Sequence, residues 1–207
     1  MISAAFTVIC RLSNKSDAKI KPLCGKKMYQ LSENLDNQNI RIKAFVPYGM
    51  EARLIPHIWG TYNRSLNLCK EYLIEDLDCS GEFLFIDCGA HLLEILPSLV
   101  AKVHKEKGKM TYLAIEPDPL LKQSALMTKT YYENLSNNIS ILFANSLLGE
   151  SDTDINFVQK PETGDSTRYV LSNCDPIRKK QLRLDNLLAT LQLDQIRFSK
   201  RYIKVEA

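Results

Sequence analysis

The sequence predicts an α/β fold with a doubly wound parallel sheet, and two observations carry this prediction. From Glu82 onward, short apolar runs of strand length alternate with longer segments that have a helical pattern, as in chains that form a parallel sheet. The first run, at 83–86, holds four consecutive apolar residues, which is typical of a strand covered on both faces. Polar residues follow three of the runs, so the sequence indicates a ligand-binding edge.

The expected elements of this part follow one another in a regular order. We expect strands at 83–87, 111–115 and 139–144, a β segment at 155–158, and a last strand from residue 202. Helices are expected over 92–107 and 120–135, and a third opens at Leu184 with Asp185 as its N-cap. The polar stretch 159–178 is expected to be a long connection.

Two residues bear on the limits of the first helix. Pro97 lies inside the predicted span, so either the helix kinks there or it properly starts at Pro97 as its first residue. Gly108 follows the span and is a natural residue for the position after the C-cap.

Length and composition indicate one soluble domain rather than two. The chain has 207 residues, of which 45% are hydrophobic and 25% charged, an ordinary globular balance. A net charge of +3 predicts neither a nucleic-acid nor a membrane partner. The six cysteines form no C-x-x-C pair, so no metal site is predicted. The apolar setting of Cys88 favours a reduced thiol and hence a cytoplasmic protein.

Residues 1–80 are expected to form an N-terminal leader and a helical and β extension, with the α/β domain at 81–207. No periodic pattern stands out in 1–39, which suggests a loosely attached leader. The alternation at 40–46 predicts a strand. The stretch 51–77 has a helical pattern, and we expect it to pack on the sheet or to form part of a lid.

The first candidate binding motif is the turn that follows the first strand. Asp87 comes at the end of the strand, and Gly89 and Ala90 are small enough to let a ligand approach the backbone. A glycine turn before a helix is expected to present backbone N–H groups to an anionic group. A dinucleotide fingerprint needs two further glycines that are not present, so a bound pyrophosphate is not expected.

Two further motifs follow the next strands. Glu116 ends the second strand, where an acidic side chain can accept the hydroxyls of a ribose, and Pro117 and Pro119 remove competing donors. The alternative is a helix-terminal acid that interacts with the helix dipole. The pair Asn145-Ser146 ends the third strand and is placed either to contact a purine edge or to form a turn.

Five stretches together resemble the FkbM-type methyltransferases that use S-adenosylmethionine. They occur in the family's order over residues 82–207: Asp87-Cys-Gly-Ala-His91, Ala114-Ile-Glu-Pro-Asp118, Ala144-Asn-Ser-Leu-Leu-Gly-Glu-Ser151, Leu184-Asp-Asn-Leu-Leu188 and Ile203-Lys-Val-Glu206. The resemblance implies a Rossmann-like fold of the class I methyltransferase type. It also implies an enzyme that O-methylates a sugar or another small hydroxylated acceptor.

The resemblance also implies roles for individual residues. The cofactor S-adenosylmethionine would be held through its methionine part by the first turn, through its ribose by the second strand end, and near its adenine by the third. The cofactor residues are Asp87, Gly89, Ala90, His91, Glu116, Pro117 and Asn145. Glu206 would stand beside the transferred methyl group as the catalytic acidic residue, and Lys204 would orient the acceptor.

The chain departs from the family pattern in two ways, and each favours a rival hypothesis. His91 and Leu93 stand where the family has an asparagine and a second glycine. The family continues with an acidic-glycine motif and further strands after this point, so the domain is expected to be incomplete at its C-terminus. Both departures favour a degenerate, non-catalytic cofactor-binding protein. A third hypothesis, a nicotinamide-dependent oxidoreductase, is disfavoured by the missing glycines.

Overall fold

The computed structural model describes residues 19–23, 28–34, 41–47, 74, 76–93, 95–119, 121–159, 169–171 and 177–205. These residues form three sheets and three α-helices. The helical stretch expected over 51–77 lies almost wholly outside them. No helix among the described residues combines the length and the apolar character that crossing a bilayer requires.

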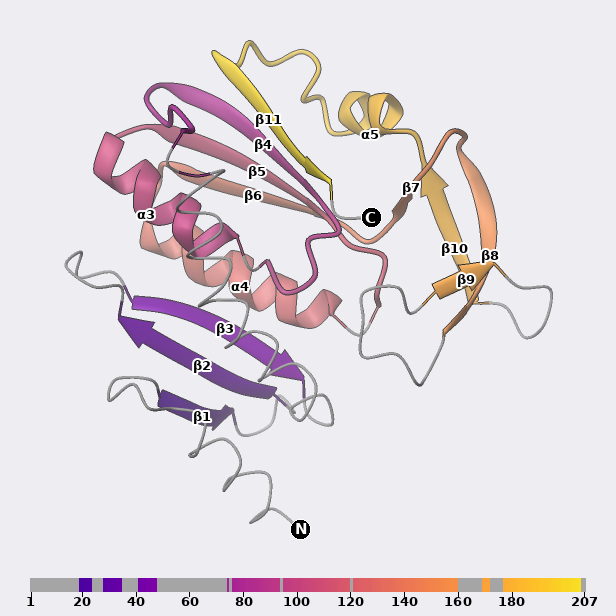
Figure 1. Cartoon of the computed structure of the whole chain (residues 1–207), viewed down its shortest axis with the longest axis horizontal. Coiled ribbons are helices and arrows are strands. Elements are labelled where there is room, and N and C mark those ends of the chain that lie inside the picture. Colours follow the sequence, from indigo (N-terminus) through magenta and orange to yellow (C-terminus); the bar gives the residue numbers. More distant parts are fainter. Residues whose placement is uncertain are drawn as a thin grey trace.

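Four parallel strands form the central sheet, in the order β11-β4-β5-β6 (Figure 1). Their bounds are β4 Glu82–Cys88, β5 Lys109–Ile115, β6 Ile139–Ala144 and β11 Lys200–Val205. Every pair in this sheet runs parallel, so the predicted α/β fold with a parallel sheet is confirmed. The chain adds β5 and β6 on one side of β4 and then returns to add β11 on the other. The strand order therefore reverses between β4 and β11.

Apolar side chains cover both faces of this sheet. Phe83, Phe85 and Tyr112 belong to a core shared with α3 (Leu96–Glu106) and α4 (Lys122–Leu135). Leu84 and Ile86 belong to the opposite core, which α5 (Leu184–Thr190) covers. Successive residues of β4 alternate between the two cores, as strand geometry requires. The continuous apolar run in β4 reflects this burial on both sides.

The helix ends differ in detail from the sequence prediction. Helix α3 begins at Leu96 with Pro97 in its first turn, which agrees with a start near the proline rather than a kink. Lys107, not Gly108, takes the left-handed conformation at its end, with φ 56°. Asp185 is not the N-cap of α5, because Arg183 holds that position. Asp185 lies in the first turn and accepts two hydrogen bonds from the Arg183 guanidinium, at 3.0 and 2.7 Å.

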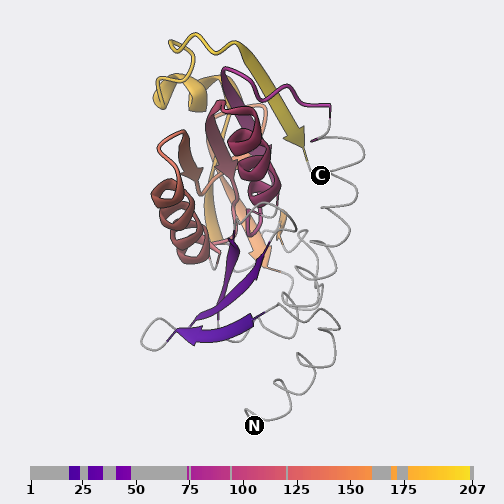
Figure 2. The ribbon, with the colours of Figure 1, turned by 90° about the vertical axis from the view of Figure 1, so that its left-hand side faces the viewer.

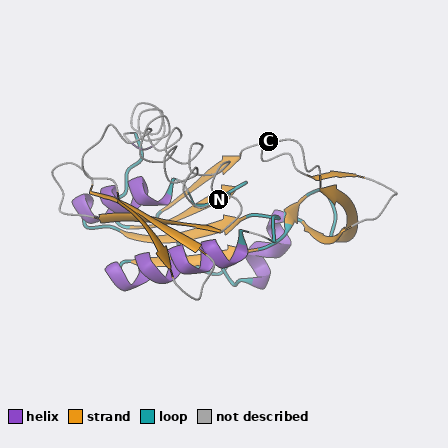
Figure 3. Ribbon diagram, turned by 90° about the horizontal axis from the view of Figure 1, so that it is seen from below, coloured by secondary structure: helices purple, strands orange, loops and turns teal. Residues whose placement is uncertain are grey.

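A small sheet is inserted between β6 and α5. It contains β7 (Leu147–Leu148), β8 (Thr153–Gln159), β9 (Tyr169–Leu171) and β10 (Ile177–Leu182), and it forms one end of the molecule (Figure 3). The predicted β segment at 155–158 is confirmed in β8. The prediction of a connection over 159–178 is wrong at β9 and at the start of β10. The three consecutive polar residues 178–180 in β10 hide the strand from a hydrophobic pattern, and pairing with β8 forms it.

An antiparallel sheet precedes the parallel one and packs beside its helices (Figure 2). It consists of β1 (Lys19–Leu23), β2 (Met28–Asn34) and β3 (Arg41–Pro47). The predicted strand at 40–46 is confirmed as β3, but the expectation of a loosely attached leader over 1–39 is wrong at β1 and β2, which pair into this sheet. Hydrogen bonds join β3 to α4: the Ser124 hydroxyl donates to the Phe45 carbonyl, and the Lys43 N–H donates to the Tyr132 hydroxyl at 3.2 Å.

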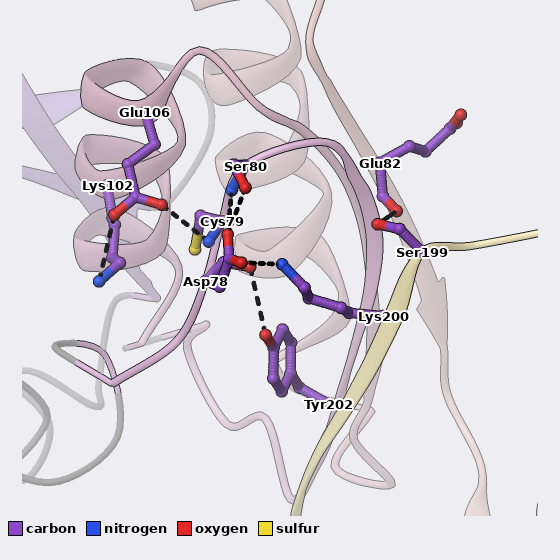
Figure 4. A network of polar contacts seen from close by, with 9 residues as sticks. All are labelled: Asp78, Cys79, Ser80, Glu82, Lys102, Glu106, Ser199, Lys200 and Tyr202. Carbon is purple, nitrogen blue, oxygen red and sulfur yellow. Dashed lines mark hydrogen bonds and ion pairs between the residues drawn. The ribbon is translucent and has the colours of Figure 1, made fainter.

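The amino edge of the parallel sheet is closed by the segment 78–81 (Figure 4). The Asp78 carboxylate pairs with the Lys200 ammonium at the start of β11. The Cys79 N–H donates to the Glu106 carboxylate at the end of α3, at 2.8 Å, and the Lys109 N–H donates to the Gly81 carbonyl at 2.8 Å. This segment therefore ties together the first helix and the first residues of three strands.

Gly108 allows that closure, and its replacement gives a direct test. A methyl group at Gly108 would lie 1.7 Å from the Cys79 carbonyl oxygen, and backbone atoms on both sides leave it no room. We expect Gly108→Ala to lower the free energy of unfolding in urea by about 2 kcal/mol or more.

Gly149→Ala is the matched control. Its methyl group would meet the Gln181 side chain at 2.0 Å, and a side chain can turn away where a backbone cannot. We expect a change within about 0.5 kcal/mol. Equal losses in the two variants would contradict the backbone clash at Gly108.

Candidate functional site

The carboxyl ends of the four parallel strands meet at one edge of the sheet. The predicted residues after β4, β5 and β6 lie along this edge because the strands run parallel, and Lys204 reaches it from β11. Glu206, the predicted catalytic acidic residue, lies outside the described residues. The structure therefore brings the other candidate residues to one edge of the sheet, and the order of its strands reverses between β11 and β4, where ligands bind in open α/β sheets.

The turn after β4 has left-handed backbone at every second residue. Gly89, His91 and Leu93 have φ angles of 79°, 45° and 60°. Glycine adopts this conformation freely, whereas histidine and leucine do so at a cost. The two residues that depart from the family pattern thus occupy two of the left-handed positions. Leu93 is 0% exposed and belongs to the core shared with α3 and α4, which indicates that its burial offsets the strained backbone.

The backbone donors of this turn are used inside the protein. The N–H groups of Gly89 and Ala90 both donate to the Ile115 carbonyl, at 3.0 and 3.1 Å, and the His91 N–H donates to the Glu116 carboxylate at 2.8 Å. The expectation that these N–H groups are presented to an anion is therefore wrong. The physical reason is that β5 ends beside the turn, and its last carbonyl and the following carboxylate accept them.

Glu116 connects three strand ends. Its Oε2 accepts the His91 N–H of the first turn, and its Oε1 accepts the Asp118 N–H of its own turn at 2.8 Å. The Asn145 side-chain amide, from the end of β6, donates to the Glu116 carbonyl at 2.7 Å. Glu116 is only 6% exposed. Burial raises the pKa of Glu116, and the two backbone hydrogen bonds oppose that rise.

A buried ion pair links the fourth strand to the first. Lys204 and Asp87 are direct partners in the register of β11 and β4, and Lys204 Nζ lies 2.9 Å from Asp87 Oδ1. The Tyr112 hydroxyl, from β5, donates to Asp87 Oδ2. The Asp87 side chain is 1% exposed and that of Lys204 is 19% exposed. A charge buried this deeply needs such partners.

Tyr112 is a member of the site that the sequence analysis missed. Its ring stacks on Phe85, with centroids 5.8 Å apart, and it is fully buried. The signal was present, because a tyrosine among apolar residues of a strand covered on both faces requires a partner for its hydroxyl. Pattern alone did not show that the partner is Asp87, two residues beyond Phe85 on the neighbouring strand.

Two other groups near the strand ends complete the site. Ser146 is 5% exposed, and its hydroxyl has no hydrogen-bond partner within the part of the chain that the structure describes. Burial raises the pKa of the Cys88 thiol to about 11, so this thiol is protonated at neutral pH and is not a poised nucleophile. No group of three or more metal-ligating side chains gathers among the described residues.

Comparison with known protein-family models and with curated proteins finds no match for this chain.

The raised pKa of Glu116 gives a stability prediction with a definite sign. Between the ordinary value of 4.5 and the raised value, the folded state holds more protons than the unfolded chain. Stability therefore falls as the pH rises through that range, by about 1.4 kcal/mol for each unit of pKa shift. Urea unfolding of the wild type and Glu116→Gln from pH 4 to 8 measures the effect. The wild type should lose stability relative to the variant as the pH rises. A difference in free energy of unfolding between the two proteins that does not change with pH would refute the raised pKa of Glu116.

The strained backbone at Leu93 gives a second stability prediction. Glycine and alanine at residue 93 both remove the buried side chain, but only glycine accepts a φ of 60° without cost. We expect Leu93→Gly to be more stable than Leu93→Ala by about 1 kcal/mol. Leu92 is buried, but its backbone is not left-handed. There we expect Leu92→Ala to be more stable than Leu92→Gly by about 0.5–1 kcal/mol. The same order at both positions, measured by urea unfolding, would rule out strain at Leu93.

Proposed function

We propose that this chain binds S-adenosylmethionine at the carboxyl edge of the parallel sheet and is an O-methyltransferase of the class I, Rossmann-like type. The observation that carries the proposal is the Glu116 carboxylate, held at the end of β5 by the N–H groups of His91 and Asp118. Each carboxylate oxygen can accept more than one hydrogen bond. Glu116 is therefore a preorganised acceptor for ribose hydroxyls at the place where such a sheet binds nucleosides.

The state of the turn after β4 favours this cofactor over a dinucleotide. A pyrophosphate needs backbone N–H donors at the glycine turn, and those of Gly89, Ala90 and His91 have acceptors within the protein. S-adenosylmethionine carries no phosphate; it presents a sulfonium, an α-ammonium group, ribose hydroxyls and a single α-carboxylate. A site rich in acceptors and poor in backbone donors suits it better.

The proposed roles of the residues follow the strand ends. Asp87, Gly89, Ala90 and His91 would line the methionine part, Glu116 and Pro117 the ribose, and Asn145 the adenine. When bound, S-adenosylmethionine supplies an electrophilic methyl group, so the protein mainly positions donor and acceptor. We assign Glu206 as the general base that takes the proton of the acceptor hydroxyl. Orientation of the acceptor by Lys204 stays a prediction.

The proposed acceptor is a sugar or another small hydroxylated molecule, and the proposed location is the cytoplasm. The buried, unpaired thiols of Cys79 and Cys88 support a reducing compartment. A second candidate function, cofactor binding without catalysis, is favoured by the ion pair that engages Lys204 with Asp87. Turnover of methyl groups onto a panel of sugars separates the two.

Calorimetric titration tests the cofactor. We expect S-adenosylmethionine and S-adenosylhomocysteine to bind and NAD not to bind. Glu116→Gln should weaken S-adenosylmethionine binding about tenfold or more, because a charged acceptor is lost.

Glu133→Gln is the matched control for that variant. Glu133 also holds a backbone N–H, that of Ile141 at 2.8 Å, but it projects from α4 and not from the carboxyl edge. The affinity of Glu133→Gln for S-adenosylmethionine should equal that of the wild type. If the wild type does not bind S-adenosylmethionine, the proposed function is refuted. If Glu116→Gln binds it as tightly as the wild type does, the assignment of Glu116 to the ribose hydroxyls is refuted.

A further inference from the structure

The ion pair at the point of strand-order reversal differs from the other Lys–Asp pair of β11. At the carboxyl edge, Lys204 pairs with an Asp87 side chain that is 1% exposed; at the amino edge, Lys200 pairs with an Asp78 side chain that is 55% exposed. Exposed pairs contribute little to stability. Burying Asp87 costs desolvation energy that an apolar pair in the same place would avoid. A buried pair at a ligand-binding edge therefore calls for an explanation beyond stability.

The geometry directs the lysine toward the edge of the sheet. The Asp87 carboxylate accepts from Lys204 Nζ at 2.9 Å and from the Tyr112 hydroxyl, so the two neighbouring strands set its position. Lys204 is the member of the group with solvent access, at 19%. Any ligand that meets this group from solvent meets the lysine and not the aspartate.

We propose that Lys204 is the receptor for the α-carboxylate of the cofactor's methionine part, and that Asp87 and Tyr112 are positioning residues that hold its side chain in place. This inference rests on the proposed function and deepens it. It assigns Lys204 to the cofactor rather than to the acceptor, and Asp87 to the lysine rather than to direct contact with the cofactor.

Chemical complementarity supports this assignment. The methionine part of S-adenosylmethionine ends in an α-carboxylate and an α-ammonium group. A carboxylate requires a cation or several N–H donors, and the N–H groups of Gly89, Ala90 and His91 in the adjoining turn have acceptors within the protein. An ammonium group carries three donors, and its ion pair keeps it directed at one point. Lys204 therefore supplies the charge that the backbone of this turn does not offer.

Decarboxylated S-adenosylmethionine gives the test, because it lacks the α-carboxylate and keeps the sulfonium, the amine and the adenosine. The full chain is titrated calorimetrically with both compounds. The wild type should bind S-adenosylmethionine at least tenfold more tightly than the decarboxylated compound.

Three variants separate recognition from folding. Lys204→Met alone leaves Asp87 buried without its cation and can fail to fold, so the main variant is the neutral pair Asp87→Asn with Lys204→Met. Lys204→Arg keeps the positive charge. The control is the neutral pair Asp78→Asn with Lys200→Met, which removes the same charges from the amino edge of the same strand. Circular dichroism and urea unfolding establish that each variant is folded.

We expect only the neutral pair at 87 and 204 to lose the preference for S-adenosylmethionine over the decarboxylated compound. The neutral pair at 87 and 204 should bind the two compounds within about twofold of each other, with the loss confined to S-adenosylmethionine. Lys204→Arg and the control pair should keep the tenfold preference. Retained preference in the neutral pair, or equal weakening for both compounds, overturns the role of Lys204 while leaving the proposed function intact. A wild type that binds neither compound overturns both.

Discussion

Parallel pairing of β4 with β5 and with β11 is the constraint on which the rest of the structure depends. It brings the carboxyl ends of strands that are far apart in the sequence to one edge. It also sets the register that places Lys204 directly opposite Asp87. Because the strand order reverses between β4 and β11, this pair lies at the position where open α/β sheets bind ligands.

Two buried carboxylates lie at this edge, and the protein satisfies each in a different way. Asp87 has a cation and a phenol as partners, whereas Glu116 has two backbone N–H groups. A hydrogen-bonded cation cancels the charge of Asp87 inside the sheet. Burial raises the pKa of Glu116 although its two backbone N–H partners oppose that rise, and its carboxylate oxygens have capacity to accept further hydrogen bonds. The first arrangement favours a structural anchor, and the second favours ligand recognition.

The positions of the site residues are easier to predict from the sequence than the interactions that these residues make. The strands β4, β5 and β6 contain continuous apolar runs, so each was predicted at nearly its observed place. The β1–β2 hairpin and the strands β9 and β10 belong to two small, mainly antiparallel sheets, and they carry weak patterns because such sheets do not need two apolar faces. The strained turn at His91 and Leu93 shows the same limit, since left-handed backbone at a buried leucine arises only from its packing.

Polar residues that follow three of the apolar runs are visible in the sequence alone, and they predict the α/β fold and the edge that carries the site. Which of these groups face one another is a property of the tertiary structure. Lys204 and Asp87 are 117 residues apart, and no local pattern encodes that they pair. The same holds for the N–H groups of Gly89 and Ala90, whose acceptor is a carbonyl on another strand. Hydrogen bonds between distant segments depend on register, and register is set by the packing of the whole sheet.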